Sequence, residues 1–425
     1  MESEKKARQI LEMAHPSEFS KVLLRNFDVP VGEYMCKLRE YSPPNPLECE
    51  LRMAFLAELR RIGVSGKDLE EAISLIEHTR TLQTIAHTTL TNGPGFLGAN
   101  WLASLGGTNG STCISATISG IPFNNESRPG CLNFGADRKI SDFIMQTYPK
   151  RRALETANQQ RAKYTPTERI SITSGNRRSS VYSSLTSDFT KDIISYFSPA
   201  ISKYVSKNIN LNDFTAFALS FSSILDSEVL NRKMIYLDLC SVVAKYLYLI
   251  FENESHPITR FCFNKTYLEN MILVLGNQPL FSNSGVNAEP FSQFFYQDSS
   301  ISNGSEVIKW EVSAIRLLLL DKKLCPSLFL TYMVISFVNG FQCYGGFNQV
   351  EYLKKFKTYL CTIKLFADYN IDKVPTDSLT VGRILDVRNS NVYPLDTLFG
   401  KEAVLDPQVS FGKFATPTII YKMGQ

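Results

Sequence analysis

The chain contains 425 residues, and this length predicts two or three packed units rather than a single core. Hydrophobic residues make up 44% of the chain and charged residues 20%, which is typical of a globular protein and excludes a largely disordered one. The formal net charge is only +4, whereas a general nucleic-acid binder needs a concentrated basic surface. No nucleic-acid partner is therefore expected.

Cysteine and histidine usage gives no sign of a metal site. The nine cysteines are scattered singly without a CxxC pair, and the four histidines are isolated from one another and from cysteine or acidic pairs. Neither a zinc ribbon nor a thioredoxin-type dithiol is indicated, so no metal ligands are predicted. Unpatterned thiols of this kind are typical of proteins in a reducing compartment.

The apolar stretches of the chain favour a cytoplasmic protein without membrane contact. The charged start of the sequence lacks the apolar segment of a secretory signal. The most apolar stretch, Ser327 to Phe341, is shorter than the roughly 20 residues that a membrane-spanning helix needs.

The order of the predicted elements indicates an α/β fold with a largely parallel sheet. Residues 1–85 have apolar residues at helical spacing, which predicts a helical N-terminal region, and residues 86–425 form an α/β core with inserted helices. In the core, strands are expected at 112–118 and 234–239, with a helix from 240 to 251. Residues 282–303 are polar and predict a loop that serves as lid or linker, residues 307–341 predict two sheet strands, and residues 350–367 predict a helix.

The segment Tyr344 to Leu353 is the most informative of the chain, because a glycine pair joins an apolar run to an amphipathic helix. Gly345 and Gly346 allow close approach of a ligand to the backbone, and the amides of the helix start would point at that ligand. Gln349 and Glu351 lie just inside the helix, where polar side chains can face a pocket.

A second glycine-rich segment runs from His87 to Gly98. As a pocket loop it would offer His87 as an acid or base, Thr91 and Asn92 as hydrogen-bonding groups, and Gly93 and Gly95 for close backbone approach. The alternative is an ordinary turn between a helix and the next element. The segment lacks both GxGxxG and the P-loop pattern, so neither common nucleotide-binding fingerprint is present.

Two further places carry polar residues that could orient a substrate. Asn124 and Glu126 follow a predicted strand, and ligands of open α/β sheets bind outside the carboxyl ends of strands. The alternative there is an exposed turn. Arg316 lies inside an apolar run and needs a partner, which is either a substrate carboxylate or a structural acidic residue.

The order of these motifs resembles the bacillithiol synthase family, which is thought to add cysteine to glucosaminyl malate. Thr91-Asn92-Gly93-Pro94 is similar to a Gly-Pro loop near the front of that family's Rossmann-like core. Arg316-Leu317, Leu324-Cys325-Pro326 and the segment from Gly345 to Tyr352 are similar in order to its Arg-Pro, Leu-Pro and Gly-Gly-x-x-Glu-Ile-x-Tyr segments. The resemblance implies a Rossmann-like sheet, with Gln349 in place of the family's glutamate and Tyr352 at its tyrosine.

Several departures separate the chain from that family pattern, among them a reduced acidic cluster, a shorter chain and the lack of a long coiled-coil segment. The paired glutamines of the front loop are replaced by His87-Thr88-Thr89, and Arg316 is not followed by proline. If the relation holds, it is distant and the substrate differs.

These patterns predict a small-molecule biosynthetic enzyme, with a ligase- or transferase-like step that joins an amine or thiol compound to a small acceptor. His87 and Glu351 are the predicted catalytic residues. The predicted substrate-binding residues are Thr91, Asn92, Gly93, Gly95, Asn124, Glu126, Arg316, Gly345, Gly346, Gln349 and Tyr352.

The alternative hypothesis is a non-catalytic small-molecule-binding or interaction protein on a degenerate enzyme scaffold, which the missing glutamines favour. Under both hypotheses the expected partner is a small molecule. The sequence leaves the cofactor, the substrate and a homo-oligomeric state open.

Overall fold

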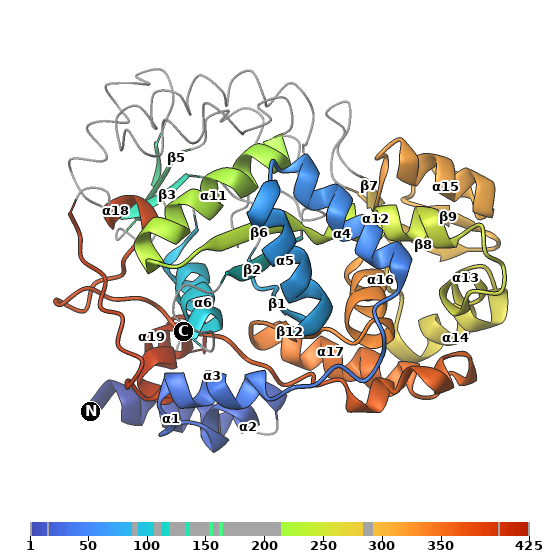
Figure 1. Cartoon of the computed structure of the whole chain (residues 1–425). Helices are drawn as coiled ribbons and strands as arrows, with labels where there is room; N and C mark the ends of the chain where they lie inside the picture. Colours follow the sequence, from blue (N-terminus) through green and yellow to red (C-terminus); the bar gives the residue numbers. More distant parts are fainter. Residues whose placement is uncertain are drawn as a thin grey trace.

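The structure is a computed structural model, and its arrangement is shown in Figure 1. It describes residues 2–14, 17–86, 92–105, 112–118, 132–135, 153–155, 161–164, 214–283, 292–397 and 400–423.

Helices precede the first strand. They are α1 (Glu2–Met13), α2 (Glu18–Arg25), α3 (Val31–Arg39), α4 (Cys49–Arg61) and α5 (Gly66–His78). Helix α4 packs on a helix of the later core, α12 (Leu239–Ile250), and α1 packs on the C-terminal helix α19 (Phe411–Met423), so that the first and last described helices lie side by side (Figure 1). The expected division at residue 85 stays a prediction.

A four-stranded parallel sheet forms the centre of the described fold. Its strands are β1 (Thr81–Gln83), β2 (Cys113–Thr117), β6 (Met234–Asp238) and β12 (Gln342–Tyr344), in the order β12-β1-β2-β6. Their side chains are almost continuously buried, as expected for strands covered on both faces. This sheet and its helices confirm the predicted α/β class, and β2, β6 and α12 lie where the sequence placed them.

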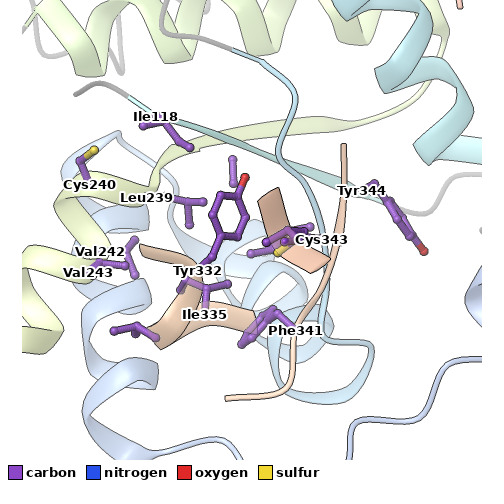
Figure 2. Close-up of a cluster of buried hydrophobic side chains, with 14 of the residues drawn as sticks. Ile118, Leu239, Cys240, Val242, Val243, Tyr332, Ile335, Phe341, Cys343 and Tyr344 are labelled. Carbon is purple, nitrogen blue, oxygen red and sulfur yellow. The ribbon is translucent and has the colours of Figure 1, made fainter. Parts of the chain in front are cut away.

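Different helices cover the two faces of the sheet. Helices α6 (Pro94–Leu105) and α11 (Phe214–Leu230) pack on the face that carries Gln83, Ser115 and Tyr236. On the other face, α12, α16 (Leu328–Tyr332) and the π-helical segment η2 (Met333–Val338) contribute to a buried hydrophobic cluster around Cys343 (Figure 2).

Antiparallel strands form two further sheets, which the sequence did not predict. One has the order β10-β9-β8-β7-β11, and the other has the order β3-β5-β4. Their strands are β3 (Leu132–Gly135), β4 (Ala153–Glu155), β5 (Arg161–Tyr164), β7 (Phe281–Asn283), β8 (Gln293–Gln297), β9 (Ser300–Ser302), β10 (Val307–Lys309) and β11 (Leu324–Pro326). The prediction of a loop over 282–303 was therefore wrong for its described residues, because β8 and β9 bury Phe294, Tyr296 and Ile301.

The predicted pair of sheet strands in residues 307–341 is present as the short strands β10 and β11. The helix between them, α15 (Val312–Leu320), and the helical segments α16 and η2 after them were not expected. The helix after β12 begins earlier than expected and is α17 (Phe347–Leu360). The remaining described helices are α13 (Pro257–Cys262), α14 (Lys265–Leu275), η3 (Lys364–Tyr369), η4 (Ile371–Lys373) and α18 (Pro394–Thr397). Within the described ranges, no helix is both long enough and apolar enough to span a membrane.

Helix α6 is held against the C-terminal segment by a close backbone approach. A Cβ atom added at Gly98 would lie 2.7 Å from the carbonyl oxygen of Gly382. Only glycine fits there without a shift of the backbone. This contact fixes α6 between the sheet and the last part of the chain.

Candidate functional site

The strand order of the parallel sheet reverses between β1 and β12. The chain proceeds from β1 to β2 and β6 on one side, and returns to place β12 on the other side of β1. In open α/β sheets, ligands bind outside the carboxyl ends of the strands at such a reversal. We call this place the β1–β12 junction and define it by Thr84, Ile85, Gly345, Gly346 and Gln349.

The helices that follow these two strands lie on opposite faces of the sheet. Helix α6 receives a hydrogen bond from the Gln83 side chain to Ala99 O (2.8 Å), on the Gln83 face. Helix α17 contacts the opposite face, because Gln349 Nε2 donates to Thr84 Oγ1 (2.7 Å). The helices therefore diverge from the β1–β12 junction, and their amino-terminal ends lie at the carboxyl edge of the sheet.

The glycine pair of the rear motif is explained by packing within the chain. A Cβ atom at Gly345 would lie 2.1 Å from Gln349 Cδ, so the Gln349 side chain occupies the space over Gly345. Gly346 is the N-cap residue of α17 and has ordinary backbone angles, and its added Cβ would lie 3.2 Å from Ile85 Cδ1. The segment after β1 and the rear motif thus meet directly, with Gln349 buried between them.

The front motif is described in part. His87 and Thr91 lie outside the described residues, as do Asn124 and Glu126 of the loop after β2. Gly93 precedes α6, and a Cβ atom added there would have no neighbour within 4 Å in the described part of the chain. Among the described residues, space beside the start of α6 is therefore open at Gly93.

Asn92 belongs to a buried polar cluster between the sheet and the helices α6 and α11. Its Nδ2 donates to Asp226 Oδ2 (2.9 Å) and to the Tyr236 hydroxyl oxygen (2.6 Å). Asn100 donates to the same two groups, and Tyr236 donates its proton to Asp226 Oδ2 (2.5 Å). Ser115 donates to Asn100 Oδ1 (3.2 Å), which ties the cluster to β2.

Two oxygens of this cluster have no hydrogen-bond partner in the described part of the chain. They are Asn92 Oδ1 and Asp226 Oδ1, and both residues are almost completely buried. Burial raises the pKa of Asp226 to about 6, against the lowering effect of the hydrogen bonds from Tyr236, Asn100 and Asn92. A buried carboxyl group that titrates near neutrality can hold or release a proton.

The cluster continues as a polar row across the whole parallel sheet. Tyr344, Gln83, Ser115 and Tyr236 stand opposite one another on β12, β1, β2 and β6. All four are buried, and residues opposite one another in register project from the same face. Gln83 Nε2 also donates to Thr380 Oγ1 (2.9 Å), which joins the row to the C-terminal segment.

The structure places Glu351 at the start of α2. Its Oε1 accepts hydrogen bonds from the backbone amides of Glu18 (2.6 Å) and Phe19 (3.2 Å). These are free amides of the first turn of α2, so Glu351 caps that helix. Tyr352 lies in an aromatic group, with ring centroids 5.5 Å from those of Tyr332 and Phe356. Both residues have structural contacts that the sequence did not predict.

Arg316 lies on α15, away from the β1–β12 junction (Figure 1). Its guanidinium group pairs with Glu252 (2.6 Å), donates through Nε to Tyr248 O (3.0 Å) and lies 4.6 Å from the centroid of the Tyr248 ring. The sequence left open whether Arg316 pairs with a substrate carboxylate or with an acidic residue of the chain. The structure shows the acidic residue, Glu252.

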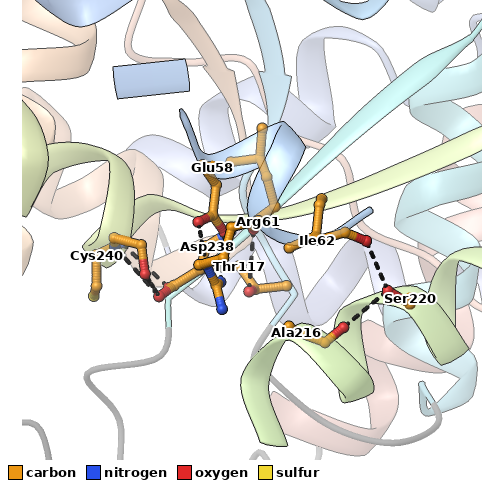
Figure 3. A network of polar contacts seen from close by, with 10 residues as sticks. Glu58, Arg61, Ile62, Thr117, Ala216, Ser220, Asp238 and Cys240 are labelled. Carbon is orange, nitrogen blue, oxygen red and sulfur yellow. Dashed lines mark hydrogen bonds and ion pairs between the residues drawn. The ribbon is translucent and has the colours of Figure 1, made fainter. Parts of the chain in front are cut away.

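A second polar network lies at the carboxyl ends of β2 and β6 (Figure 3). Asp238 caps α12 by accepting from the amides of Cys240 (3.2 Å) and Ser241 (3.3 Å). Its own amide donates to Glu58 Oε1 (2.9 Å), and Glu58 is paired with both Arg61 Nε (2.6 Å) and Arg61 Nη2 (2.8 Å). Burial raises the pKa of Glu58, against the opposing charge of Arg61.

The sequence analysis missed Asp226, Tyr236, Asn100 and Ser115. One signal was present, because Asp226 is a charged residue in an apolar helix and needs a partner for the same reason as Arg316. The partners themselves come from segments far apart in the sequence, such as Asn92 and Tyr236, which are separated by 144 positions. Spacing along the chain does not reveal such a contact.

The described residues contain no group of three or more His, Cys, Asp or Glu side chains that could hold a metal ion. Cys343 is buried against Ser336, and burial raises the pKa of its thiol to about 12, which removes it as a nucleophile at neutral pH. Comparison with protein-family models finds none that matches this chain, and comparison with curated proteins finds no match either.

Proposed function

We propose that the chain binds a small polar molecule at the β1–β12 junction. The observation that carries the proposal is the reversal of strand order there, with α6 and α17 leading to opposite faces of the sheet. The amino-terminal ends of both helices lie at this edge, where free amides favour a ligand with a carboxylate or phosphate group. The open space at Gly93 gives such a ligand a route to the start of α6.

Non-catalytic binding is the form of this function that the contacts favour. Glu351 caps α2, Gln349 fills the space over Gly345, and Arg316 is paired with Glu252. Three of the predicted site residues are thus engaged within the chain. This is the arrangement expected of a binding protein on a degenerate enzyme scaffold.

An enzyme is the second candidate, and the Asp226 cluster favours it. A general acid or base needs a pKa near the working pH, and the Asp226 carboxyl group has one of about 6. Under this proposal Asp226 and His87 move protons in a ligase- or transferase-like step that joins an amine or thiol compound to a small acceptor. The resemblance to the bacillithiol synthase family supports this type of step, and the departures from that family's front loop indicate a different substrate.

The same resemblance supports a Rossmann-like relation for the parallel sheet, and the helical spacing of apolar residues supports a helical N-terminal region over residues 1–85. Both belong to the proposal, together with a cytoplasmic location, the absence of a nucleic-acid partner and a homo-oligomeric state.

A ligand screen with matched variants tests the binding site. Thermal unfolding is followed with nucleotides, amino acids and amino sugars, and a ligand at 100 times its dissociation constant should raise the free energy of unfolding by about 2.7 kcal/mol. Gly93→Trp should abolish the effect, because its ring fits the open space and blocks the start of α6, whereas Gly93→Ala should retain it. The proposal fails if no class of ligand stabilises the protein, or if the tryptophan variant responds as the unmodified chain does.

Turnover assays with any ligand that binds separate the two candidates. Asp226→Asn should retain binding and lose turnover if the protein is an enzyme. If the unmodified chain binds a ligand but does not convert it when every acceptor class is supplied, the protein is a binding protein.

A further inference from the structure

A cavity of about 20 Å³ lies beside the parallel sheet, on the face that carries Gln83. Residues of α3, α5, α6, β1, β2 and β12 line it. Its lining includes Arg39, Thr81, Thr112, Cys113 and Tyr344. A cavity of this volume has room for about one water-sized particle.

Two hydrogen-bond donors at the cavity have no partner in the described part of the chain. One is Nε of Arg39, and the other is the hydroxyl group of Tyr344, whose side chain is 2% exposed. Figure 2 shows the Tyr344 ring directed away from Cys343 and its hydrophobic cluster. A buried donor without an acceptor is costly, so such a group indicates a missing partner.

The electrostatics of the cavity favour a negative partner. Arg39 is the single charged residue of the lining, and it has no acidic partner among the described residues; its Nη2 donates to Ala103 O (2.8 Å). Burial raises the pKa of Tyr344 to about 12 and that of Cys113 to about 11, so both groups stay neutral at pH 7. Tyr344 therefore keeps its proton for donation, and Cys113 does not neutralise Arg39.

The other polar groups of the lining are already engaged. Thr112 Oγ1 donates to Glu71 (2.5 Å), Thr79 Oγ1 donates to Leu75 O (2.9 Å), and Gln83 bonds with Ala99 and Thr380. Thr81 Oγ1 lies 3.2 Å from Thr79 Oγ1. Arg39 Nε and the Tyr344 hydroxyl group, which the Thr81 side chain approaches, are the donors left for a ligand.

We propose that this cavity binds a halide-sized monovalent anion between Arg39 Nε and the Tyr344 hydroxyl group. Larger oxyanions such as sulfate exceed the volume of the cavity. The anion would join the end of α3 to the end of β12 and so stabilise the packing of the N-terminal helices on the sheet. The inference is independent of the ligand proposed for the β1–β12 junction.

Anion-dependent thermal unfolding of the full chain tests this site. Sodium bromide, compared with sodium gluconate at equal ionic strength, should raise the unfolding midpoint in a saturable manner. Tyr344→Phe and Arg39→Gln should lose this bromide-specific shift. Arg388→Gln removes the same charge from an exposed position and should retain the shift.

The position of the ion is tested by anomalous diffraction from bromide-soaked crystals. A peak between Arg39 and Tyr344 is expected. Identical responses to bromide and gluconate would show that the cavity holds water only, and a full bromide response in Tyr344→Phe would place the ion elsewhere; either result overturns the proposal. The phenylalanine variant is informative because its lost hydroxyl group has no partner within the described chain, so its stability in gluconate should be unchanged or higher.

Discussion

Gln349 and Thr84 are 265 positions apart in the sequence, yet the Gln349 amide donates to the Thr84 hydroxyl group at 2.7 Å. This bond joins the ends of β1 and β12 at the place where the strand order reverses. The two glycine-rich motifs of the sequence therefore flank one edge of one sheet. The contact also explains why glycine occupies position 345, since the Gln349 side chain lies over it.

The first prediction is a coupling between Gly345 and Gln349. Gly345→Ala should lower the free energy of unfolding by roughly 1–3 kcal/mol, because the new methyl group displaces a buried, hydrogen-bonded amide. The same substitution in a Gln349→Ala background should have a clearly smaller effect. Urea denaturation of the four proteins of this double-mutant cycle measures the coupling, with Lys355→Gln as an exposed control on the same helix. Additive effects would contradict the packing described.

The second prediction concerns Glu351. Glu351→Ala should lower the free energy of unfolding by about 1 kcal/mol, because α2 loses the acceptor for two of its first amides. Hydrogen exchange should show faster exchange of the Glu18 and Phe19 amides while α17 stays protected. An unchanged stability, with loss of a measured activity instead, would support the catalytic role that the sequence predicted.

The third prediction is a pH dependence caused by Asp226. Its folded pKa of about 6 lies above the ordinary value of 3.8, so the folded state binds the proton more tightly than the unfolded state. The stability contributed by this group is therefore present below about pH 4, falls as the pH rises to about 6, and is constant above that. Asp226→Asn should remove the dependence and stabilise the protein at pH 7.5 by up to about 3 kcal/mol.

Chemical denaturation of the unmodified chain and Asp226→Asn across this pH range measures the difference. Tyr236→Phe is the control, because it removes a hydrogen bond to Asp226 while leaving the carboxyl group buried. The Tyr236→Phe substitution should raise the pKa of Asp226 further and widen the pH range over which the stability changes. If the free energies of unfolding of the unmodified chain and of Asp226→Asn differ by the same amount at every pH, the pH dependence is not caused by Asp226.

The fourth prediction concerns the buried pair of Glu58 and Arg61. Arg61→Met should destabilise the protein by about 3 kcal/mol or more, because Glu58 is 3% exposed and would lose its charged partner. Adding Glu58→Gln to that variant should recover part of the loss, since the side chain then carries no charge. Thermal unfolding of the single and double variants is the measurement. If the single and the double variant lose the same stability, the ion pair between Glu58 and Arg61 is not the stabilising element.

Local patterns predicted the elements whose signals lie close together in the sequence. The strand β6 and the helix α12 are an example, because a short apolar run ends at Asp238, which then caps the helix. The prediction failed for 282–303, where the hairpin between β8 and β9 turns through Asp298 and Ser299, both with positive φ. Asp-Ser lacks the glycine that usually marks such a turn.

The helix α15 was missed for a different reason. Its leucines lie on several sides, with Leu319 buried and Leu317 and Leu320 exposed, so the segment reads as a continuous apolar run rather than an amphipathic helix. In the candidate site, the structure shows internal contacts for several of the residues that the sequence selected, among them Gln349, Glu351 and Arg316. Their partners, such as Glu18 for Glu351, are set by tertiary packing and cannot be derived from spacing.

The polar row of Tyr344, Gln83, Ser115 and Tyr236 has a consequence for how the sheet assembles. If a strand slipped by one residue, Leu82 or Ile114 would face the side-chain amides of Asn92 and Asn100 and the carboxyl group of Asp226. A polar side chain would then point into the hydrophobic cluster around Cys343 on the other face of the sheet. Each misaligned pairing would thus leave buried groups without acceptors. The row makes correct alignment of four strands a condition of folding, even though three of them belong to distant parts of the chain.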